Sequence, residues 1–277
     1  MNLSKASTHK FLKILAIFFA VLFSLFPIIF MFTVSLSKSP DFLATGKFTP
    51  TLLNYKEILS NRSFHFLDYL RNSFIVATAA SIIATSFGTL AAYPLARTSF
   101  PHRETLAVLM LSLTMFPQIS VVGYVYRMTS RLSLINTYPG LIFPHAAWST
   151  ALAVWMMWNY FKKIPIELDK AALVDGASYL KILFKVVLPL SLPALASTFL
   201  LVFLFSFNEF LFALMLTTDY KAQTIPVGIA MFQGLHGELP WGYIMAASAL
   251  AALPVMLIAI LTQKYIVEGL TAGAVKS

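Results

Sequence analysis

A run of apolar residues from Phe11 to Leu36 contains a single charged side chain, Lys13. Because about 20 apolar residues in a helix cross the hydrocarbon core of a bilayer, this run is long enough to span a membrane. It is also longer than the roughly 7–15-residue apolar core of a secretory signal peptide, and no small-residue cleavage pattern follows it. We therefore predict a retained first transmembrane helix, preceded by a cytoplasmic N-terminus at residues 1–10.

The remainder of the chain has the same apolar character. Of its 277 residues, 58% are hydrophobic and 11% are charged, whereas about 25% of the residues of a soluble domain are charged. Apolar segments between polar loops predict five further spans, at residues 70–93, 106–128, 140–161, 192–217 and 242–263. The predicted fold is an all-α membrane protein with six transmembrane helices in residues 11–263, followed by a cytoplasmic tail at residues 264–277.

The distribution of basic residues orients these helices. Twelve Lys and Arg residues fall on the side that carries both termini, and eight fall on the other side. Basic residues accumulate on the cytoplasmic side of membrane proteins, so we expect a multi-pass protein of a bacterial or archaeal cell membrane with both termini in the cytoplasm. The formal net charge of +9 then indicates this bias and contact with anionic lipid, not binding to nucleic acid.

The motifs of common catalytic and metal sites are missing from the sequence. There is no cysteine, and the five histidines are scattered without a helix-spaced pair, so no metal site is expected. Neither a G-x-S-x-G nucleophile motif nor a phosphate-binding G-x-x-x-x-G-K-[ST] loop occurs. We therefore do not expect this chain to be an enzyme or to bind ATP itself.

The loop between the fourth and fifth predicted spans, Lys162–Pro193, carries eight charged residues. It is expected to form two short helices. Asp169 places negative charge near the positive end of the first helix. Gly176 permits a bend or a close backbone approach, and Ser178 is suited to cap a second helix from Tyr179 to Leu188.

This loop resembles the cytoplasmic coupling loop of the membrane subunits of binding-protein-dependent ABC importers. The family pattern is Glu-Ala-Ala, three residues, Gly, nine residues, Ile, one residue and Leu-Pro. The residues that match at this spacing are Ala171, Ala172, Gly176, Leu188 and Pro189. Lys170 stands where the first Glu is usual, so the polar contacts of the loop would fall to Asp169 and Asp175. The resemblance implies a type I ABC importer fold, in which residues 162–191 dock into a groove on an ATPase subunit.

The end of the chain, GLTAGAVKS from Gly269, is similar to the tail of the second permease subunit of maltose-type importers. In that family the tail inserts between the two ATPase subunits. The residues implied in this contact are Gly269, Leu270, Thr271, Gly273, Val275 and Lys276.

Together these resemblances imply the permease subunit of an ATP-driven sugar importer for maltose, trehalose or a related oligosaccharide. The implied partners are a second permease subunit that forms a heterodimer with this chain, two ATPase subunits that hold ATP and Mg²⁺, and an extracytoplasmic sugar-binding protein. No cofactor is implied in this chain itself. The glycine- and proline-rich stretch from Ile225 to Trp241 is expected to protrude outward towards the binding protein.

Glu209 is the one acidic residue deep inside a predicted span. Because a charge at that depth is costly unless it is paired or hydrated, a role in the translocation path is expected by default. Asn208 and Gln118 are further candidates to line this path. The alternatives are that Glu209 pairs with an arginine or a partner subunit, and that Gln118 makes interhelical hydrogen bonds.

Two other classes of protein remain open at this stage. An ion-gradient-driven secondary transporter would be expected to show internal repeats, broken helices in both halves and more intramembrane acids. A membrane enzyme would require a cluster of His, Asp or Glu on facing helices, which the sequence does not present.

Overall fold

The computed structural model describes residues 3–38, 46, 48–99, 101–232 and 240–271, with side chains between residues 12 and 263 of these ranges. The regular structure in these ranges is helical, apart from an isolated bridge between Ser37 and Pro50. The fold class is therefore all-α, as predicted. The chain divides into two compact units, residues 1–66 with 231–252 and residues 67–230 with 253–277.

The first unit contains α1 (Leu3–Ser35), α3 (Leu53–Ser60) and a 3₁₀ turn. The buried Asn54 joins the two helices, because its Nδ2 donates hydrogen bonds to the carbonyl oxygens of Ser35 at 2.8 Å and Ser37 at 2.9 Å. The C-terminal end of α1 is thereby anchored, while residues 12–33 of this helix include no buried residue.

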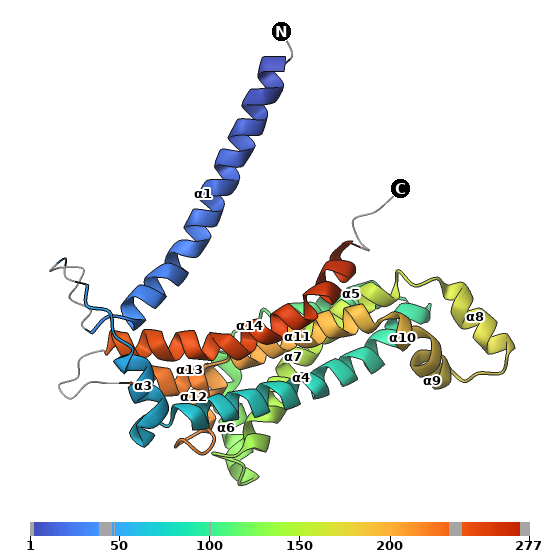
Figure 1. Cartoon of the computed structure of the whole chain (residues 1–277). Coiled ribbons are helices and arrows are strands. Elements are labelled where there is room, and N and C mark those ends of the chain that lie inside the picture. The colour runs from blue at the N-terminus through green and yellow to red at the C-terminus, as the bar shows by residue number, and fades with distance from the viewer. Residues whose placement is uncertain (1–2, 39–45, 47, 100, 233–239, 272–277) are drawn as a thin grey trace. The chain divides into compact units, whose positions relative to one another are not determined.

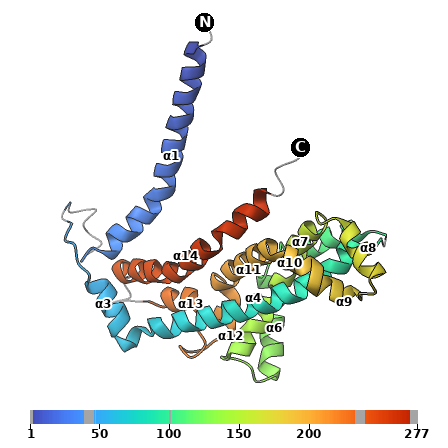
Figure 2. The ribbon, with the colours of Figure 1, turned by 45° about the vertical axis from the view of Figure 1, so that its right-hand side comes forward.

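The second unit contains most of the helices. They are α4 (Phe66–Arg97), α5 (Arg103–Leu113), α6 (Ile119–Arg131), α7 (Tyr138–Phe161), α8 (Ile166–Val174), α9 (Tyr179–Ile182), a π-helix at Leu183–Val187, α10 (Leu188–Leu190), α11 (Leu192–Phe207), α12 (Leu211–Leu216), α13 (Ile225–Ala230) and, from residue 253 onward, α14 (Trp241–Thr271). Figures 1 and 2 show α8 and α9 at one end of α4, α7 and α11, and α12 at the other end.

Small residues let the central helices of this unit approach closely. Ala84 on α4, Ala153 on α7 and Val202 on α11 form one buried cluster. A Cβ atom added to Gly88 would lie 2.6 Å from the Cβ of Ala153, so the two backbones can meet only at a glycine. Such contacts stabilise helix pairs in a bilayer, where apolar burial alone does not drive association.

Within the described residues, four helices are long and apolar enough to cross a membrane, and a bent pair provides a fifth candidate span. These helices correspond to five of the predicted spans and confirm an integral membrane protein. The predicted third span, residues 106–128, is not one helix, because α5 ends at Leu113 and α6 begins at Ile119. Pro117 lies in this break, where its ring removes a backbone donor and disfavours helix at the preceding residue. The count of six spans stays a prediction.

The loops at the α12 end of this unit are joined by Asn136, whose backbone is left-handed at φ 59°. Its Nδ2 donates to Oδ1 of Asp219 at 2.9 Å, and its Oδ1 accepts from the backbone N–H of Thr218 at 3.0 Å. Hydrogen bonds from Asn136 and from the backbone N–H of Lys221 lower the pKa of the Asp219 carboxyl. The loop before α7 is thus tied to the loop after α12.

The stretch predicted to protrude, Ile225–Trp241, is packed down over its first part. Residues 225–230 form α13, and a Cβ on Gly228 would overlap the ring of Tyr69. The expectation of a protruding loop is therefore wrong for α13, because that helix fills space beside Tyr69. Residues 233–239, which contain most of the remaining glycines, lie outside the described part of the chain.

Candidate functional site

The loop after α7 has the two-helix form that the sequence predicts. Helix α8 ends at Val174, and Gly176 follows with a positive φ of 78°. Its neighbour Ala177 donates a backbone hydrogen bond to Ala172 at 3.0 Å, a helix-ending contact that a left-handed glycine makes possible. Ser178 then caps α9 by accepting from the backbone N–H of Lys181 at 3.4 Å. Both predicted turn residues are confirmed.

The second half of the loop is joined to the transmembrane helix α11 (Leu192–Phe207) through a sharp bend. The helical run Tyr179–Leu190 meets α11 at an angle of 83°. Ser191 lies at the bend, is fully buried, and donates its hydroxyl hydrogen to the carbonyl oxygen of Val187 at 2.7 Å. The run includes the π-helical stretch Leu183–Val187, a rare conformation that is frequent at functional sites.

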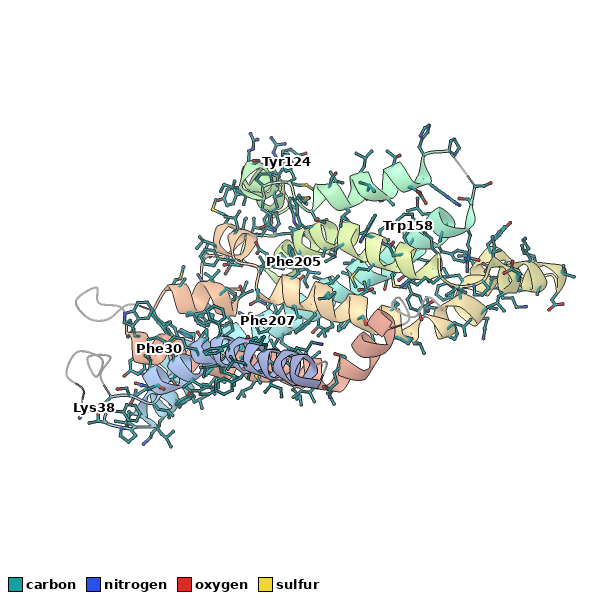
Figure 3. The ribbon with its side chains drawn as sticks, turned by 90° about the horizontal axis from the view of Figure 1, so that it is seen from above. Phe30, Lys38, Tyr124, Trp158, Phe205 and Phe207 are labelled. Carbon is teal, nitrogen blue, oxygen red and sulfur yellow. The ribbon has the colours of Figure 1, made fainter. Side chains whose placement is uncertain are left out.

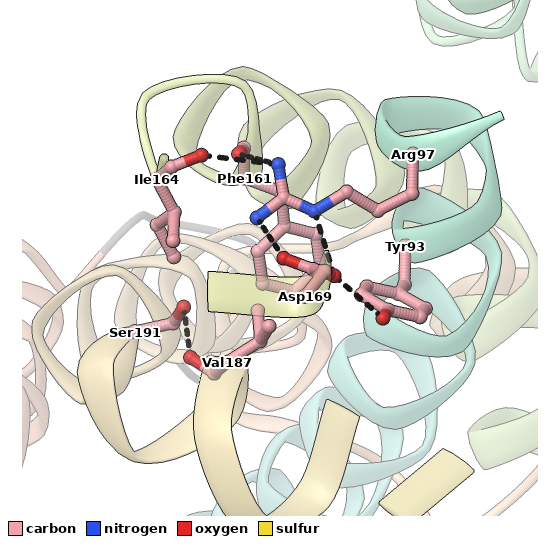
Figure 4. Close-up of polar contacts among 7 residues, drawn as sticks. All are labelled: Tyr93, Arg97, Phe161, Ile164, Asp169, Val187 and Ser191. Atoms are coloured by element: carbon pink, nitrogen blue, oxygen red, sulfur yellow. Dashed lines mark hydrogen bonds and ion pairs between the residues drawn. The ribbon is translucent and has the colours of Figure 1, made fainter. Parts of the chain in front are cut away.

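Asp169 fastens the loop to α4. Its Oδ1 accepts hydrogen bonds from Nε of Arg97 at 3.1 Å and from the hydroxyl of Tyr93 at 2.8 Å, while its Oδ2 lies 3.1 Å from Nη2 of Arg97 (Figure 4). The side chains of Arg97 and Asp169 are only 7% and 6% exposed. A bidentate pair of this kind fixes orientation as well as distance.

Arg97 also joins α4 to the end of α7. Its Nη1 donates to the carbonyl oxygens of Phe161 and Ile164, both at 3.1 Å. Phe161 is the last residue of α7 and Ile164 lies three residues beyond it, where carbonyl groups are not all satisfied by the helix itself. One guanidinium therefore connects the last turn of α4, the end of α7 and helix α8.

The predicted docking residues differ in their exposure to solvent. Lys170, Ala171, Asp175, Gly176 and Pro189 are exposed, Ala172 and Leu188 are half-buried, and Asp169 is buried. Asp169 is therefore committed to Arg97 and Tyr93 and does not face outward. The loop also exposes apolar side chains, with Val174 88% and Leu180 64% exposed. Exposed apolar groups grouped on one segment are typical of a protein-binding surface.

The three residues predicted to line a path lie on one groove. Gln118, Asn208 and Glu209 all contribute to a groove of about 730 Å³, together with Leu152, Leu201, Leu204, Phe205, Phe210 and Leu211. Asn208 is exposed and Gln118 is half-buried. Phe205 belongs to α11 and is labelled in Figure 3. The groove thus combines amide groups with apolar and aromatic walls.

Glu209 is placed differently from these two amides. It is 7% exposed and lies in the break between α11 and α12. Its Oε1 accepts from the backbone N–H of Phe212 at 2.9 Å, its Oε2 accepts from that of Ala213 at 3.2 Å, and Nε2 of His145 lies 3.1 Å from Oε2. The alternative of an arginine partner is wrong within the described chain, since the basic side chain beside Glu209 is that of His145.

Of the predicted tail residues, Gly269, Leu270 and Thr271 lie in the last turn of α14. Gly273, Val275 and Lys276 lie outside the described residues.

Three residues of these sites were not singled out from the sequence. Tyr93 and Arg97 lie four positions apart on α4 and therefore on one helix face, which is the one signal that would have grouped them. His145 carries no such signal, because its relation to Glu209 arises only when α7 packs beside the α11–α12 break.

An apolar helical chain with a polar loop locked to its transmembrane helices, and with a polar groove beside a broken helix, defines a membrane-embedded transport component. The chain belongs to the family of binding-protein-dependent transport system inner membrane components, which it matches over residues 3–271. Members of this family are transport subunits and not enzymes, as the sequence predicted.

Curated relatives span nearly the whole chain. The trehalose/maltose transport system permease protein MalG of Thermococcus litoralis is 48% identical, with 95% of this chain and 97% of the relative covered. The trehalose transport system permease protein SugB of Mycobacterium tuberculosis is 37% identical, with 92% and 93% covered.

A solved structure shares the fold. A chain of a bacterial ABC transporter involved in the import of alginate superposes with a TM-score of 0.77 at 23% identity, covering 96% of this chain and 98% of that chain.

Proposed function

We propose that this chain is a permease subunit of an ATP-driven importer of trehalose, maltose or a related oligosaccharide. The observation that carries the proposal is the coupling loop, which is locked to α4 through Asp169 and Arg97 and continues into α11 through Ser191. A displacement of this loop must therefore move transmembrane helices. The trehalose/maltose and trehalose permeases that it resembles support the substrate class.

We take the partners of this proposal from the family to which the chain belongs. Two ATPase subunits hold ATP and Mg²⁺, and one of them receives the loop at Lys170, Ala171, Asp175 and the apolar side chain of Val174. A second permease subunit completes the membrane path, and an extracytoplasmic binding protein delivers the sugar. The tail from Gly269 contacts the ATPase subunits, and its deletion should weaken assembly or coupling.

The groove supplies this chain's part of the path. Asn208 and Gln118 offer amide donors and acceptors that suit sugar hydroxyl groups, and Phe205 and Phe210 offer apolar walls. In this topology α5 and α6 together form the third span and α11 with α12 forms the fifth, which gives six spans with both termini in the cytoplasm.

The test is uptake in proteoliposomes that contain the complete complex. Labelled trehalose and maltose are supplied outside with the binding protein, and ATP is enclosed on the ATPase side. Sugar uptake that requires ATP and persists after ionophores collapse ion gradients is the expected result. Uptake that follows a proton or sodium gradient without ATP would instead establish an ion-driven carrier.

Composition of the native complex gives an independent check. A gentle detergent extract should contain this chain with a second permease, an ATPase and a binding protein. Recovery of the chain alone, or only with itself, would contradict the importer.

A further inference from the structure

The break between α11 and α12 lies beside a buried polar side chain of another helix, His145 on α7. His145 is 2% exposed and lies on α7, while Glu209 lies in the break. The pair shares a buried pocket with Ser149 on α7 and Ser206 on α11. No other titratable side chain lines this pocket in the described part of the chain.

Glu209 performs a specific task for α12. The first N–H groups of a helix have no partner within the helix. In α12, the N–H groups of Phe212 and Ala213 are both accepted by Glu209, at 2.9 and 3.2 Å. Because both carboxylate oxygens accept backbone hydrogen bonds from the start of α12, Glu209 acts as the cap of this helix, and it is also part of the groove wall.

His145 is the titratable neighbour of this carboxylate. Its Nε2 lies 3.1 Å from Oε2 of Glu209. Both ring nitrogens of His145 and the hydroxyl oxygens of Ser149 and Ser206 are buried, and none of them makes a hydrogen bond in the described structure. The close contact of Nε2 with Glu209 is therefore the polar interaction that this ring makes here.

The position of Glu209 matters because its two neighbours in sequence line the groove. Asn208 and Phe210 are both exposed there, while Glu209 between them is directed inward. Fixing the one side chain therefore fixes how the other two are presented.

We propose that His145 is a positioning residue for sugar transport: through Nε2 it holds Glu209 as the cap of α12, and so holds Asn208 and Phe210 at the groove. The transport part of this inference rests on the proposed function, whereas the positioning part does not. His145 itself does not contact the sugar.

Three substitutions separate this role from simple filling of space. In His145→Gln the side-chain amide nitrogen takes the position of Nε2. In His145→Asn it takes the position of Nδ1, away from Glu209, and in His145→Leu a similar volume is kept without a donor. A positioning role requires Gln to rescue and Asn and Leu to fail.

Hydrogen–deuterium exchange of the purified complex tests positioning without transport. With the cap loosened, the amides of Phe212 and Ala213 should exchange about tenfold faster in the Asn and Leu variants, the change expected when a buried carboxylate loses one polar partner. The Gln variant should match the natural protein, and α8 should be unaffected in all variants. Unchanged exchange at both amides in the Asn variant would overturn the proposal.

Uptake by the same variants tests the consequence. We expect sugar uptake to fall about tenfold in the Asn and Leu variants, by the same loss of one polar partner of Glu209. The Gln variant should stay close to the natural protein, with equal amounts of assembled complex in all variants. Equal uptake by Gln and Asn would overturn the role in transport. If the natural protein takes up no sugar, the proposed function fails, and the exchange experiment still decides whether His145 positions Glu209.

Discussion

Arg97 and Asp169 are 72 residues apart in the sequence, yet their side chains form a buried, two-point ion pair that joins α4 to α8. The same guanidinium also satisfies two carbonyl oxygens at the end of α7. The loop after α7 is therefore not a free peptide, because Arg97 fastens its first helix, α8, to α4 and to the end of α7.

Breaking this pair should be costly. We expect Asp169→Asn to reduce the free energy of unfolding by about 3 kcal/mol, because Arg97 is left buried without its counter-charge. Arg97→Met should cost more, since the carbonyls of Phe161 and Ile164 also lose their donor. Unfolding in detergent measures both effects, and the double variant should cost less than the sum of the single ones because the two side chains interact directly.

The matched control is the exposed pair of Lys162 and Glu104, whose Nζ–Oε1 distance is 2.9 Å. Glu104→Gln should leave the unfolding midpoint unchanged, because water screens this pair. If Asp169→Asn also leaves the unfolding midpoint unchanged, the ion pair of Arg97 and Asp169 does not hold the loop.

Gly176 should not tolerate a side chain. Its φ is 78° and nothing lies within 4 Å of an added Cβ, so Gly176→Ala meets backbone strain alone. We expect a loss of about 1 kcal/mol, together with weaker association of the ATPase subunits. Gly123→Ala is the control, since that position is helical and equally open. It should be neutral or stabilising, and equal losses at both sites would contradict the turn argument.

Substitution of Val174 should test whether this side chain lies in the surface that binds the ATPase subunits. Because this side chain is 88% exposed, Val174→Asp should leave the unfolding midpoint unchanged while weakening binding to the ATPase subunits. A carboxylate placed in an apolar contact costs a few kcal/mol, or at least about tenfold in affinity. Co-purification measures the binding, and the nearly isosteric Val174→Thr should bind better than the Asp variant. Undiminished co-purification of Val174→Asp would place the docking surface elsewhere.

The stability gained from the hydrogen bonds that Asn136 and Lys221 donate to Asp219 should depend on pH. The pKa of Asp219 is lowered by hydrogen bonds from Asn136 and Lys221, so this stability is complete above the ordinary aspartate pKa and is lost as pH falls through the lowered value. Asp219→Ala should therefore be less stable than the natural protein at neutral pH, and the difference should shrink in acid. A difference in unfolding midpoint that stays constant from pH 7 to about pH 3 would contradict this account.

The elements that were predicted correctly are those specified by local sequence. The lengths of apolar runs predict α1, α4, α7 and α14, because a bilayer demands a minimum length of each. The turn at Gly176 and the cap at Ser178 are equally local, since each depends on backbone geometry within a few residues.

The contacts that were missed are those created by tertiary packing. Asp169 carries the same charge whether it faces water or Arg97, and only the approach of α4 to α8 decides between them. The same holds for Glu209, whose inward direction depends on His145 of α7. Pro117 lies within the predicted third span, but a proline is compatible with either a kink or a complete break, so the sequence alone does not predict the break between α5 and α6.

The bend at Ser191 has a mechanical consequence. Because the two helical runs meet at 83°, a shift of the first run along its own axis would push the adjoining end of α11 nearly at right angles to the axis of α11. Such a motion of α9 and α10 would therefore displace α11, which ends beside Asn208, sideways and not along its own length.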